Sequence, residues 1–417
     1  MSTRAGGQSS GSRAAFELGA MGVGALTHAA PGVFGHNITE GYFTQPNVMV
    51  GARRGPFALT GTINLEGYTL RRGELNAGIY GEGYVDRRHP HTLVHEAMAS
   101  VTSPSRGGVR ASLSVGKGFT PFGTDDPMMR PMVKYPVNHH HAQIIERVQT
   151  IGALQFGDSV RSAVLEHAFF NGDEPVSPFI GPRWQRFGDS RTTRVTALPM
   201  RGVELQASRA FVRSPGITQG GAFDHTQSSV SLRVDRELGQ HAMPGHDMPG
   251  HDIPGDGTRG DRRYLLAEFA RTDEGFGAER VFRFHSLLAE GLIERRGWGV
   301  AARVERTDRP ENERLLDPFR TANGHIDFQI IGITRWSLAT LHVDAPSASV
   351  WRAARVRASP FMELSGARAT ALRTPAVFVP REFYGAGTLW SVTAGLRVHV
   401  GTMRHRMGRY GVLASPL

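Results

Sequence analysis

The chain has 417 residues and no cysteine, which excludes disulfide bonds, thiolate metal sites and cysteine nucleophiles. Its formal charge of +10 would attract an anionic partner such as lipopolysaccharide or nucleic acid. The arginines are spread along the chain, however, and no basic block or nucleic-acid-binding module is present, so we expect no nucleic-acid partner. No apolar run approaches the roughly 18 residues of a membrane-spanning helix, which excludes a helical membrane protein.

We expect residues 1–13 to be a flexible N-terminal segment. The opening sequence MSTRAGGQSSGSRAAF lacks the apolar core of a secretory signal peptide, so no signal peptide is visible. An exported protein would therefore need a signal that has been removed or that lies upstream of this start; otherwise the protein is not exported.

Beyond this segment the dominant pattern is an alternation of apolar and polar residues. A strand places successive side chains on opposite faces, so each alternating run has one apolar and one polar face. The clearest runs are 230–235, 298–305 and 392–400. The pattern predicts strands at 14–26, 46–54, 57–67, 92–102, 108–116, 142–155, 160–170, 189–198, 202–212, 226–236, 262–271, 278–293, 297–306, 325–342, 349–366 and 386–400.

The connections between these strands alternate in length. The short ones are 53–56, 103–107, 156–159, 198–201, 294–296 and 343–348. Those between them are mostly long, at 28–45, 68–91, 117–141, 171–188, 213–225, 307–324 and 367–385. Short periplasmic turns and long extracellular loops characterise outer-membrane barrels, whereas a soluble β-sandwich has no reason to sort its connections in this way.

The sequence therefore predicts an all-β fold, a single closed antiparallel transmembrane β-barrel in the bacterial outer membrane. It has about sixteen strands over 14–400, with fourteen to eighteen left open, and a C-terminal extension at 401–417. The apolar faces would contact outer-membrane lipid and lipopolysaccharide, and the polar faces would line the lumen. The predicted lumen-lining residues are Glu204, Arg233, Asp235, Glu268, Arg303, Glu305, Arg397 and His399.

Two stretches resemble a widespread, poorly characterised group of bacterial outer-membrane β-barrel proteins. One is GELNAGIYGEGYVDRRHPHTLVHEAMASV (73–101), and the other runs from FGTDDPMMRPMVKYPVNHHHAQ (122–143) to HAFFNGDEP (167–175). The segment LWSVTAGLRVHVG (389–401) resembles a final barrel strand, although TMRHRMGRYGVLASPL follows it and no terminal aromatic residue closes it. The resemblance covers about half of the chain and implies an outer-membrane barrel.

The sharpest local motif is QHAMPGHDMPGHDIPGDG (240–257), in which MPGHD occurs twice. Because Pro-Gly breaks regular structure, we predict an inserted periplasmic loop at 237–260. Thioether, imidazole and carboxylate groups suit copper, with zinc or nickel as alternatives, and the tract resembles those of Met/His-rich copper-resistance outer-membrane proteins. A low-complexity expansion without metal affinity is the alternative. The candidate metal ligands are His241, Met243, His246, Asp247, Met248, His251, Asp252 and Asp256.

A second group of histidines is predicted at the long-loop rim. There we expect hydrogen bonds to loop backbone, with a metal site as the alternative. On an extended strand His95 shares a face with His91, whereas Glu96 lies on the opposite face. The rim histidines are His89, His91, His95, His139, His140 and His141.

Catalytic signatures are scarce. Acid–base chemistry by Glu96, or by Glu166 with His167, is the only arrangement that the residues suggest. The chain has no GxSxG motif, no Walker loop and no strand–GxGxxG–helix unit.

Four functions follow, in decreasing order of preference. The first is a non-enzymatic barrel with a polar, charged lumen, either porin-like or handling metal ions. It needs no cofactor, and copper is the candidate ion. The second is an occluded structural or interaction barrel, the third an outer-membrane enzyme, and the fourth a soluble β-rich binding protein. The oligomeric state is left open.

The metal hypothesis is testable on the isolated 240–257 peptide. Calorimetric titration with Cu(II), and with Cu(I) under reductant, should show binding because thioether and imidazole ligands recur within one short segment. A scrambled peptide is the matched control. Equal binding by the two peptides would contradict the hypothesis.

Overall fold

The computed structural model describes residues 14–30, 35, 37–69, 92–124, 127–137, 142–158, 161–175, 179–216, 221–238, 261–311, 332–351, 353, 355–372, 379–401 and 406–414. Its strands are β1 (Ala15–Ala30), β2 (Ile38–Arg54), β3 (Phe57–Asn64), β4 (Val94–Thr102), β5 (Val109–Gly118), β6 (Arg147–Gly157), β7 (Ser162–Phe170), β8 (Ser190–Met200), β9 (Val203–Val212), β10 (Asp224–Leu238), β11 (Asp261–Phe276), β12 (Glu279–Arg295), β13 (Trp298–Glu311), β14 (Gly332–Asp344), β15 (Ala348–Trp351), β16 (Val356–Ala371) and β17 (Leu389–Gly401).

The helical elements are short. They are α1 (Glu66–Thr69), η3 (Pro127–Met129), α3 (Pro380–Tyr384) and η5 (Gly411–Leu413). No helix within the described residues is long and apolar enough to cross a membrane.

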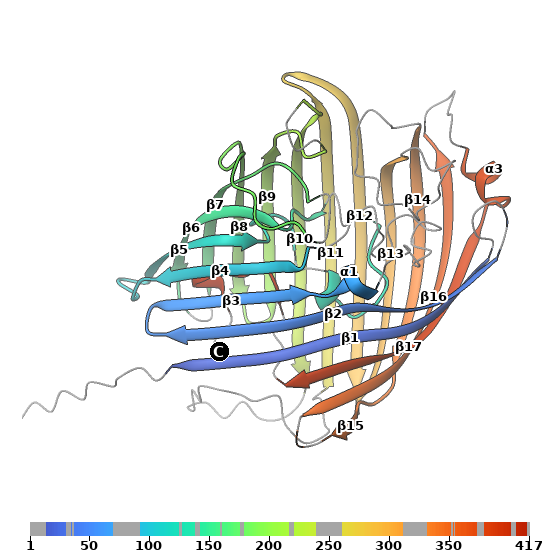
Figure 1. The fold of residues 1–417 in the computed structure, drawn as a ribbon, viewed down its shortest axis with the longest axis horizontal. Coiled ribbons are helices and arrows are strands. Elements are labelled where there is room, and N and C mark those ends of the chain that lie inside the picture. The colour runs from blue at the N-terminus through green and yellow to red at the C-terminus, as the bar shows by residue number, and fades with distance from the viewer. Residues whose placement is uncertain are drawn as a thin grey trace, which may run out of the picture.

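The strands form one antiparallel sheet that closes on itself (Figure 1). Closure is made by β1, which pairs with β2 on one side and with β17 on the other, from Gly19 opposite Gly401 to Ala30 opposite Trp390. The short β15 pairs with β16 beyond the point where β14 pairs with β16, so sixteen strands make up the cylinder. The predicted fold class and strand number are confirmed. A closed sheet leaves no edge with unpaired backbone groups, which a hydrocarbon environment requires.

The two faces of the wall differ in chemistry, as the alternation predicts. On β13, Val300 and Val304 are 49% and 56% exposed, whereas Arg303 and Glu305 are 1% and 5% exposed. The other strands also carry exposed apolar residues on the middle of their outer faces, and we call these residues the apolar belt. It includes Leu18, Leu26, Phe43, Val50, Leu59, Ile63, Leu113, Val115, Leu154, Leu165, Val195, Leu205, Val230, Leu232, Leu265, Phe269, Leu287, Ile293, Leu341, Met362, Leu364 and Leu396.

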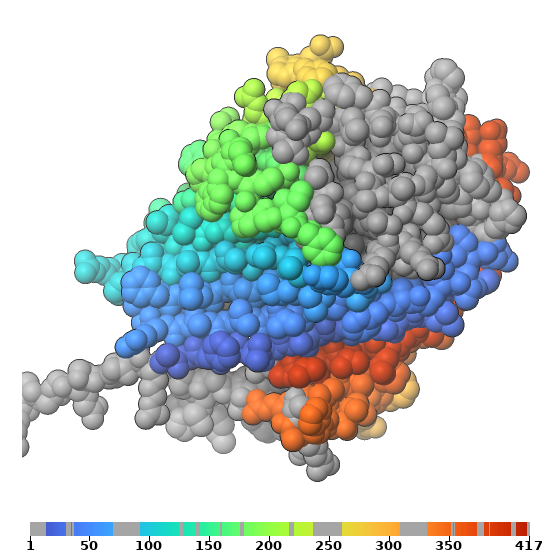
Figure 2. Space-filling model, in the orientation of Figure 1, coloured from blue at the N-terminus to red at the C-terminus, as the bar shows by residue number. Residues whose placement is uncertain are grey.

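The apolar belt places the protein in a membrane. In Figure 2 the outer surface of β1–β3 forms a continuous wall. A closed β-barrel that turns its apolar side chains outward is the architecture of outer-membrane proteins, and the predicted location in the outer membrane is confirmed.

The connections sort by length around most of the barrel. At one end, which also holds the start of β1 and the end of β17, the turns between β2 and β3, β8 and β9, and β12 and β13 are two residues long. Each of these turns contains a glycine with a positive φ, namely Gly55 (57°), Gly202 (72°) and Gly297 (83°). The opposite end carries the long connections 65–93, 119–146 and 171–189. We call the two ends the short-turn end and the long-loop end.

One predicted long connection is wrong. Residues 28–45 are mostly strand, because β1 continues to Ala30 and β2 begins at Ile38. Small residues such as Ala29 and Gly41 fit a strand as well as a loop, because strand pairing uses only backbone groups. The regular pairing of β1 with β2 is interrupted only by a bulge in β2, where Gln45 has a φ of 54°. At the long-loop end β11 and β12 are joined by two residues, so this pair forms a tall hairpin (Figure 1).

The predicted strand at 325–342 is described only from Gly332 onward, and residues 325–331 lie outside the described part. The predicted strand at 349–366 is divided into β15 and β16.

The orientation of the wall can be tested on β13. Ala302 lies on the outer face between Val300 and Val304, so Ala302→Arg should destabilise the barrel in lipid vesicles by about 2–4 kcal/mol. Ser349→Arg on the exposed β15 is the matched control and should have little effect. Equal unfolding free energies for the two variants, measured by urea titration, would contradict the orientation.

Candidate functional site in the barrel lumen

The connection between β5 and β6 crosses the lumen. We call residues 119–124 and 127–137 the lumen loop; the remaining described residues of the connection, 142–146, lead back to β6 and include the buried Glu146. The backbone of the lumen loop binds side chains of the opposite wall: the Val133 amide donates to Glu363 on β16 at 2.6 Å, and the Val137 amide donates to Glu305 on β13 at 2.8 Å. In the reverse direction, Arg303 donates to the carbonyl of Lys134 at 2.6 Å. Because β13 and β16 lie far around the sheet from β5 and β6, the loop spans the interior.

The lumen loop also packs against inward apolar side chains. Met132 joins a buried cluster with Tyr264, Leu266 and Leu288 from β11 and β12. Met128, Val133 and Tyr135 join a second buried cluster with residues of β1, β2 and β16. The lumen loop is therefore held by apolar contacts as well as by hydrogen bonds.

Ion pairs on the wall flank this loop. Arg303 lies 3.2 Å from Glu290 and 3.0 Å from Glu305, and all three side chains are almost completely buried. Glu268 accepts a hydrogen bond from Thr124 at 2.6 Å and lies 3.7 Å from Arg130 of the lumen loop. Buried charges of this kind persist only when each is paired or hydrogen-bonded.

The end of the chain forms a second insert. Residues 406–414, which we call the tail insert, follow β17 back into the barrel. Arg406 binds both carboxylate oxygens of Glu204, at 2.6 and 2.9 Å, and Arg409 contacts the same carboxylate at 3.3 Å. The hydroxyl of Tyr410 donates to Glu96 on β4 at 2.7 Å. The tail insert is therefore held to β4 and β9 by charged and polar contacts.

The contact between the tail insert and β5 requires a glycine at position 411. Gly411 has a φ of +57°, and a Cβ there would lie 2.1 Å from the Ser112 hydroxyl oxygen on β5. The next amide, of Val412, donates to that same hydroxyl at 3.0 Å. The backbone therefore lies directly against the wall, which only a residue without a side chain allows.

The wall and the inserts carry opposite charge. Seven buried glutamates bind an insert or an arginine that binds one: Glu96, Glu166, Glu204, Glu268, Glu290, Glu305 and Glu363. Three wall arginines donate to the lumen loop: Arg194, Arg303 and Arg397. The described insert residues add four bases, Arg130, Lys134, Arg406 and Arg409, and no carboxylate. The buried Asp344, 3.9 Å from Arg397, also belongs to this set, so eight acids face three wall arginines and four insert bases, and the inserts supply more than half of the bases.

A cavity of about 590 Å³ opens at the short-turn end. It is lined by the β2–β3 and β4–β5 turns together with Gly411, Val412 and Ala414 of the tail insert. The tail insert therefore forms one side of a vestibule at the short-turn end of the lumen.

All eight predicted lumen-lining residues lie on the inward faces of their strands. Glu204, Glu268, Arg303 and Glu305 are buried, and Arg233, Asp235, Arg397 and His399 are partly exposed. Asp235 binds both Arg233 and Arg262, at 2.8 and 2.6 Å.

His95 is the one predicted rim histidine within the described residues. Its Nδ1 lies 2.9 Å from Glu146, and its ring makes an edge contact with Phe119. Residues 239–260, with all candidate metal ligands of the tract, lie outside the described part, as do His89, His91, His139, His140 and His141. Among the described residues no group of three or more His, Cys, Asp or Glu side chains could hold a metal ion.

The acid–base pair of Glu166 and His167 is wrong. Glu166 points inward and binds Arg194 at 2.6 and 2.9 Å, whereas His167 binds Thr193 at 2.8 Å and makes an edge contact with the outward Phe169. Adjacent residues of a strand point to opposite faces, so the two groups cannot act on one substrate. Glu96 is bound by Tyr410 and, through its other oxygen, by Thr62.

Sequence reasoning missed the tail insert. The segment RMGRYG (406–411) reads as a polar extension, and only its arginines, set against the excess of inward glutamates, could have indicated a place inside the barrel.

No protein-family model and no curated protein matches this chain. Among solved structures it is similar to an anion-selective porin from Comamonas acidovorans (9% identity, covering 93% of this chain and 100% of that one, TM-score 0.38). It is also similar to OmpT, an outer membrane protein of Vibrio cholerae (10%, 93% and 99%, 0.48), and to the outer membrane channel DcaP of Acinetobacter baumannii (9%, 95% and 99%, 0.46). Similarities this low say nothing about solute or selectivity.

Attachment of the lumen loop should depend on pH through Lys134. Burial lowers the pKa of its ammonium group from 10.5 to about 8, although Glu305 and Glu363 oppose this shift. A displaced, solvated loop would keep the higher pKa, so between pH 8 and 10.5 it binds more protons than the docked loop. Docking is therefore weakest below pH 8 and strengthens as the pH rises.

Hydrogen exchange of the Val133 and Val137 amides, corrected for intrinsic rates, measures how strongly the lumen loop is docked at each pH. Protection should rise from pH 7 to 9.5 in the wild type and stay flat in Lys134→Met, which has no ammonium group. A wild-type profile as flat as that of the variant would contradict the assignment.

Proposed function

We propose that this chain is a non-enzymatic, porin-like outer-membrane barrel for small cationic solutes, closed by the lumen loop and the tail insert. The observation that carries the proposal is the division of charge: the acids belong to the wall, and more than half of the bases that neutralise them belong to the inserts. Neither insert is part of the strand ladder, so either can leave the lumen without breaking the sheet.

Removal of the inserts would leave a lumen with excess negative charge. Of the seven bases in these contacts, Arg194, Arg303 and Arg397 would remain beside the glutamates. Rings of acidic side chains select cations because they replace part of the hydration shell and repel anions. A cationic solute could occupy the positions that Arg406 and Arg409 hold beside Glu204.

The occluded structural barrel is the second candidate. It is supported by the burial of the central charges, since Arg303 and Glu290 have no exposed side-chain surface. A barrel of this kind would keep both inserts in place permanently. The two candidates therefore differ in whether the inserts move.

Copper remains a candidate among cationic solutes. The His/Met/Asp tract that predicts it lies within 239–260, outside the described residues, so metal capture stays a prediction that rests on the sequence alone.

Planar-bilayer recording separates the two candidates. The variant R406A/R409A should raise the open probability by about tenfold or more, because each lost charged contact is worth roughly 1.5–3 kcal/mol. Removal of residues 402–417 should do the same. The zero-current potential in a salt gradient should show cation preference, and Glu204→Gln in the truncated chain should reduce it.

The matched control is R201A/R236A, which removes two exposed arginines at the short-turn end. Heat-modifiable migration on gels confirms that each variant is folded. If folded R406A/R409A and the truncated chain both conduct no more than the wild type, the porin-like proposal is wrong and the occluded barrel stands.

A further inference from the structure

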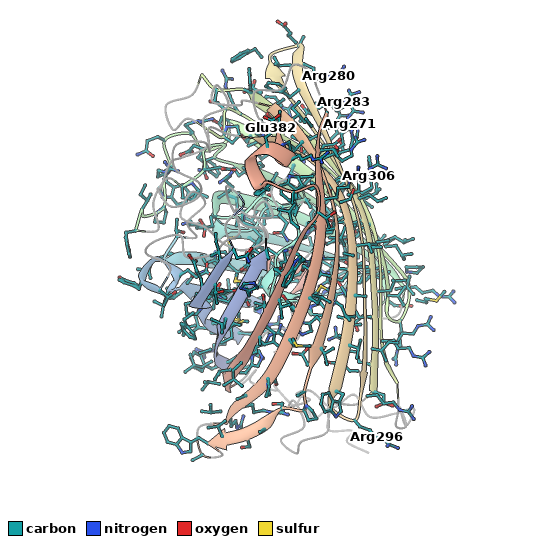
Figure 3. All side chains as sticks on the ribbon, turned by 90° about the vertical axis from the view of Figure 1, so that its right-hand side faces the viewer. Arg271, Arg280, Arg283, Arg296, Arg306 and Glu382 are labelled. Atoms are coloured by element: carbon teal, nitrogen blue, oxygen red, sulfur yellow. The ribbon has the colours of Figure 1, made fainter. Side chains whose placement is uncertain are left out.

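Arginines line the outer surface just beyond the apolar belt at the long-loop end. On β11 and β13 the first outward residue beyond the last residue named for the belt is an arginine; on β9, β12 and β16 the second one is, and on β14 the third. We call these six residues the basic band: Arg209, Arg271, Arg283, Arg306, Arg335 and Arg368. Figure 3 shows Arg271, Arg283 and Arg306 together near one end of the wall, with Arg296 at the opposite end.

Strand register makes the band continuous with the belt. Phe269 pairs with the belt residue Leu287, and the next outward pair is Arg271 with His285. Leu287 also pairs with Arg306, so apolar and basic side chains meet on neighbouring strands. Adjacent strands lie about 4.8 Å apart, so the guanidinium groups of Arg271, Arg283 and Arg306 on β11–β13 lie within reach of one headgroup. The whole band covers six strand spacings, about 29 Å, and is wide enough for more than one headgroup.

Carboxylates neutralise only part of the band. Asp273 binds Arg271 and Arg283, and Asp308 binds Arg335 at 2.6 Å. Arg209, Arg306 and Arg368 are exposed, and their guanidinium groups contact no carboxylate in the described part of the chain. Six arginines less two aspartates leave four positive charges.

The band occupies one flank of the barrel. Within this flank β10 places Ser228 opposite both Arg209 and Arg271, and at its edge the exposed Arg191 of β8 lies over the ring of Phe211. On β1, β2, β6 and β7 the outward positions at the same level are His28, Thr39, Thr150 and His167. On β5 the basic residue Lys117 is buried. A one-sided band indicates a discrete partner, since a general preference for arginine at a membrane interface would surround the cylinder.

The depth of the band identifies the chemistry of that partner. The long-loop end of an outer-membrane barrel faces outward, so the band lies at the headgroup level of the outer leaflet. The guanidinium fork matches the oxygens of a phosphate group, and desolvation at the edge of the belt strengthens such pairs. From these positions we infer that the basic band binds the phosphates of lipopolysaccharide, whose acyl chains then lie along the belt of β9–β16.

The short-turn end provides the matched control. It also carries exposed outward arginines on the same flank, Arg236, Arg263 and Arg295, but they face the opposite leaflet. Lipopolysaccharide in an asymmetric membrane cannot reach them, whereas a non-specific attraction of anions to arginine would use both ends.

The experiment compares R209A/R306A/R368A with R236A/R263A/R295A. The first variant removes only arginines without a carboxylate partner, so it leaves no buried acid unpaired. Each full-length barrel is expressed into the outer membrane, extracted, and assayed for co-purified lipopolysaccharide. Binding of added phosphorylated lipid A, and of lipid A without phosphates, is then measured in detergent.

R209A/R306A/R368A should bind phosphorylated lipid A at least about tenfold more weakly than the wild type and carry less co-purified lipopolysaccharide, while the control variant carries as much co-purified lipopolysaccharide as the wild type. Lipid A without phosphates should bind weakly to all three proteins. Wild-type affinity in R209A/R306A/R368A, an equal loss in both variants, or tight binding of the unphosphorylated lipid would each overturn the assignment. Conductance in phospholipid bilayers does not enter this test, so it is independent of the proposed function.

Discussion

The interior of this protein depends on how carboxylates are held inside a closed cylinder. Taking an ionised group away from water costs several kcal/mol unless a cation or hydrogen-bond donor replaces the lost hydration. Seven buried glutamates of the wall have such partners. Among the described residues, only three wall arginines, Arg194, Arg303 and Arg397, donate to the lumen loop. Four more bases, Arg130, Lys134, Arg406 and Arg409, come from the two inserts, which lie outside the ladder.

The two inserts provide the wall glutamates with different kinds of partner. The lumen loop offers backbone amides, as Val133 does to Glu363, and adds the apolar contacts of Met128 and Met132. The tail insert offers the guanidinium groups of Arg406 and Arg409 and the hydroxyl of Tyr410. Water and salt compete with charged contacts more readily than with packed apolar ones, so the tail insert is the easier of the two to displace.

Arginine has opposite roles on the two faces of the same wall. Arg303 is buried between Glu290 and Glu305 and neutralises them, whereas Arg306, three residues later on β13, is exposed on the outer face without a carboxylate contact in the described chain. The period of two decides which role each residue takes, and a shift of one residue in register would exchange them.

The alternation of residues such as Val300 and Arg303 by itself determined the barrel, the outward face of each strand and the inward position of Glu204, Glu268, Arg303 and Glu305, because side-chain direction in a strand follows from sequence parity. It could not determine where β1 gives way to β2, since Gly41 and Ala29 are compatible with either loop or ladder. Nor could it find the partners of Glu204 and Glu96, which lie about two hundred and three hundred residues away at Arg406 and Tyr410. Only closure of the sheet brings the end of the chain back to β4 and β9. The content of the lumen was therefore decided by the tertiary structure, because it depends on contacts across the cylinder that no local pattern records.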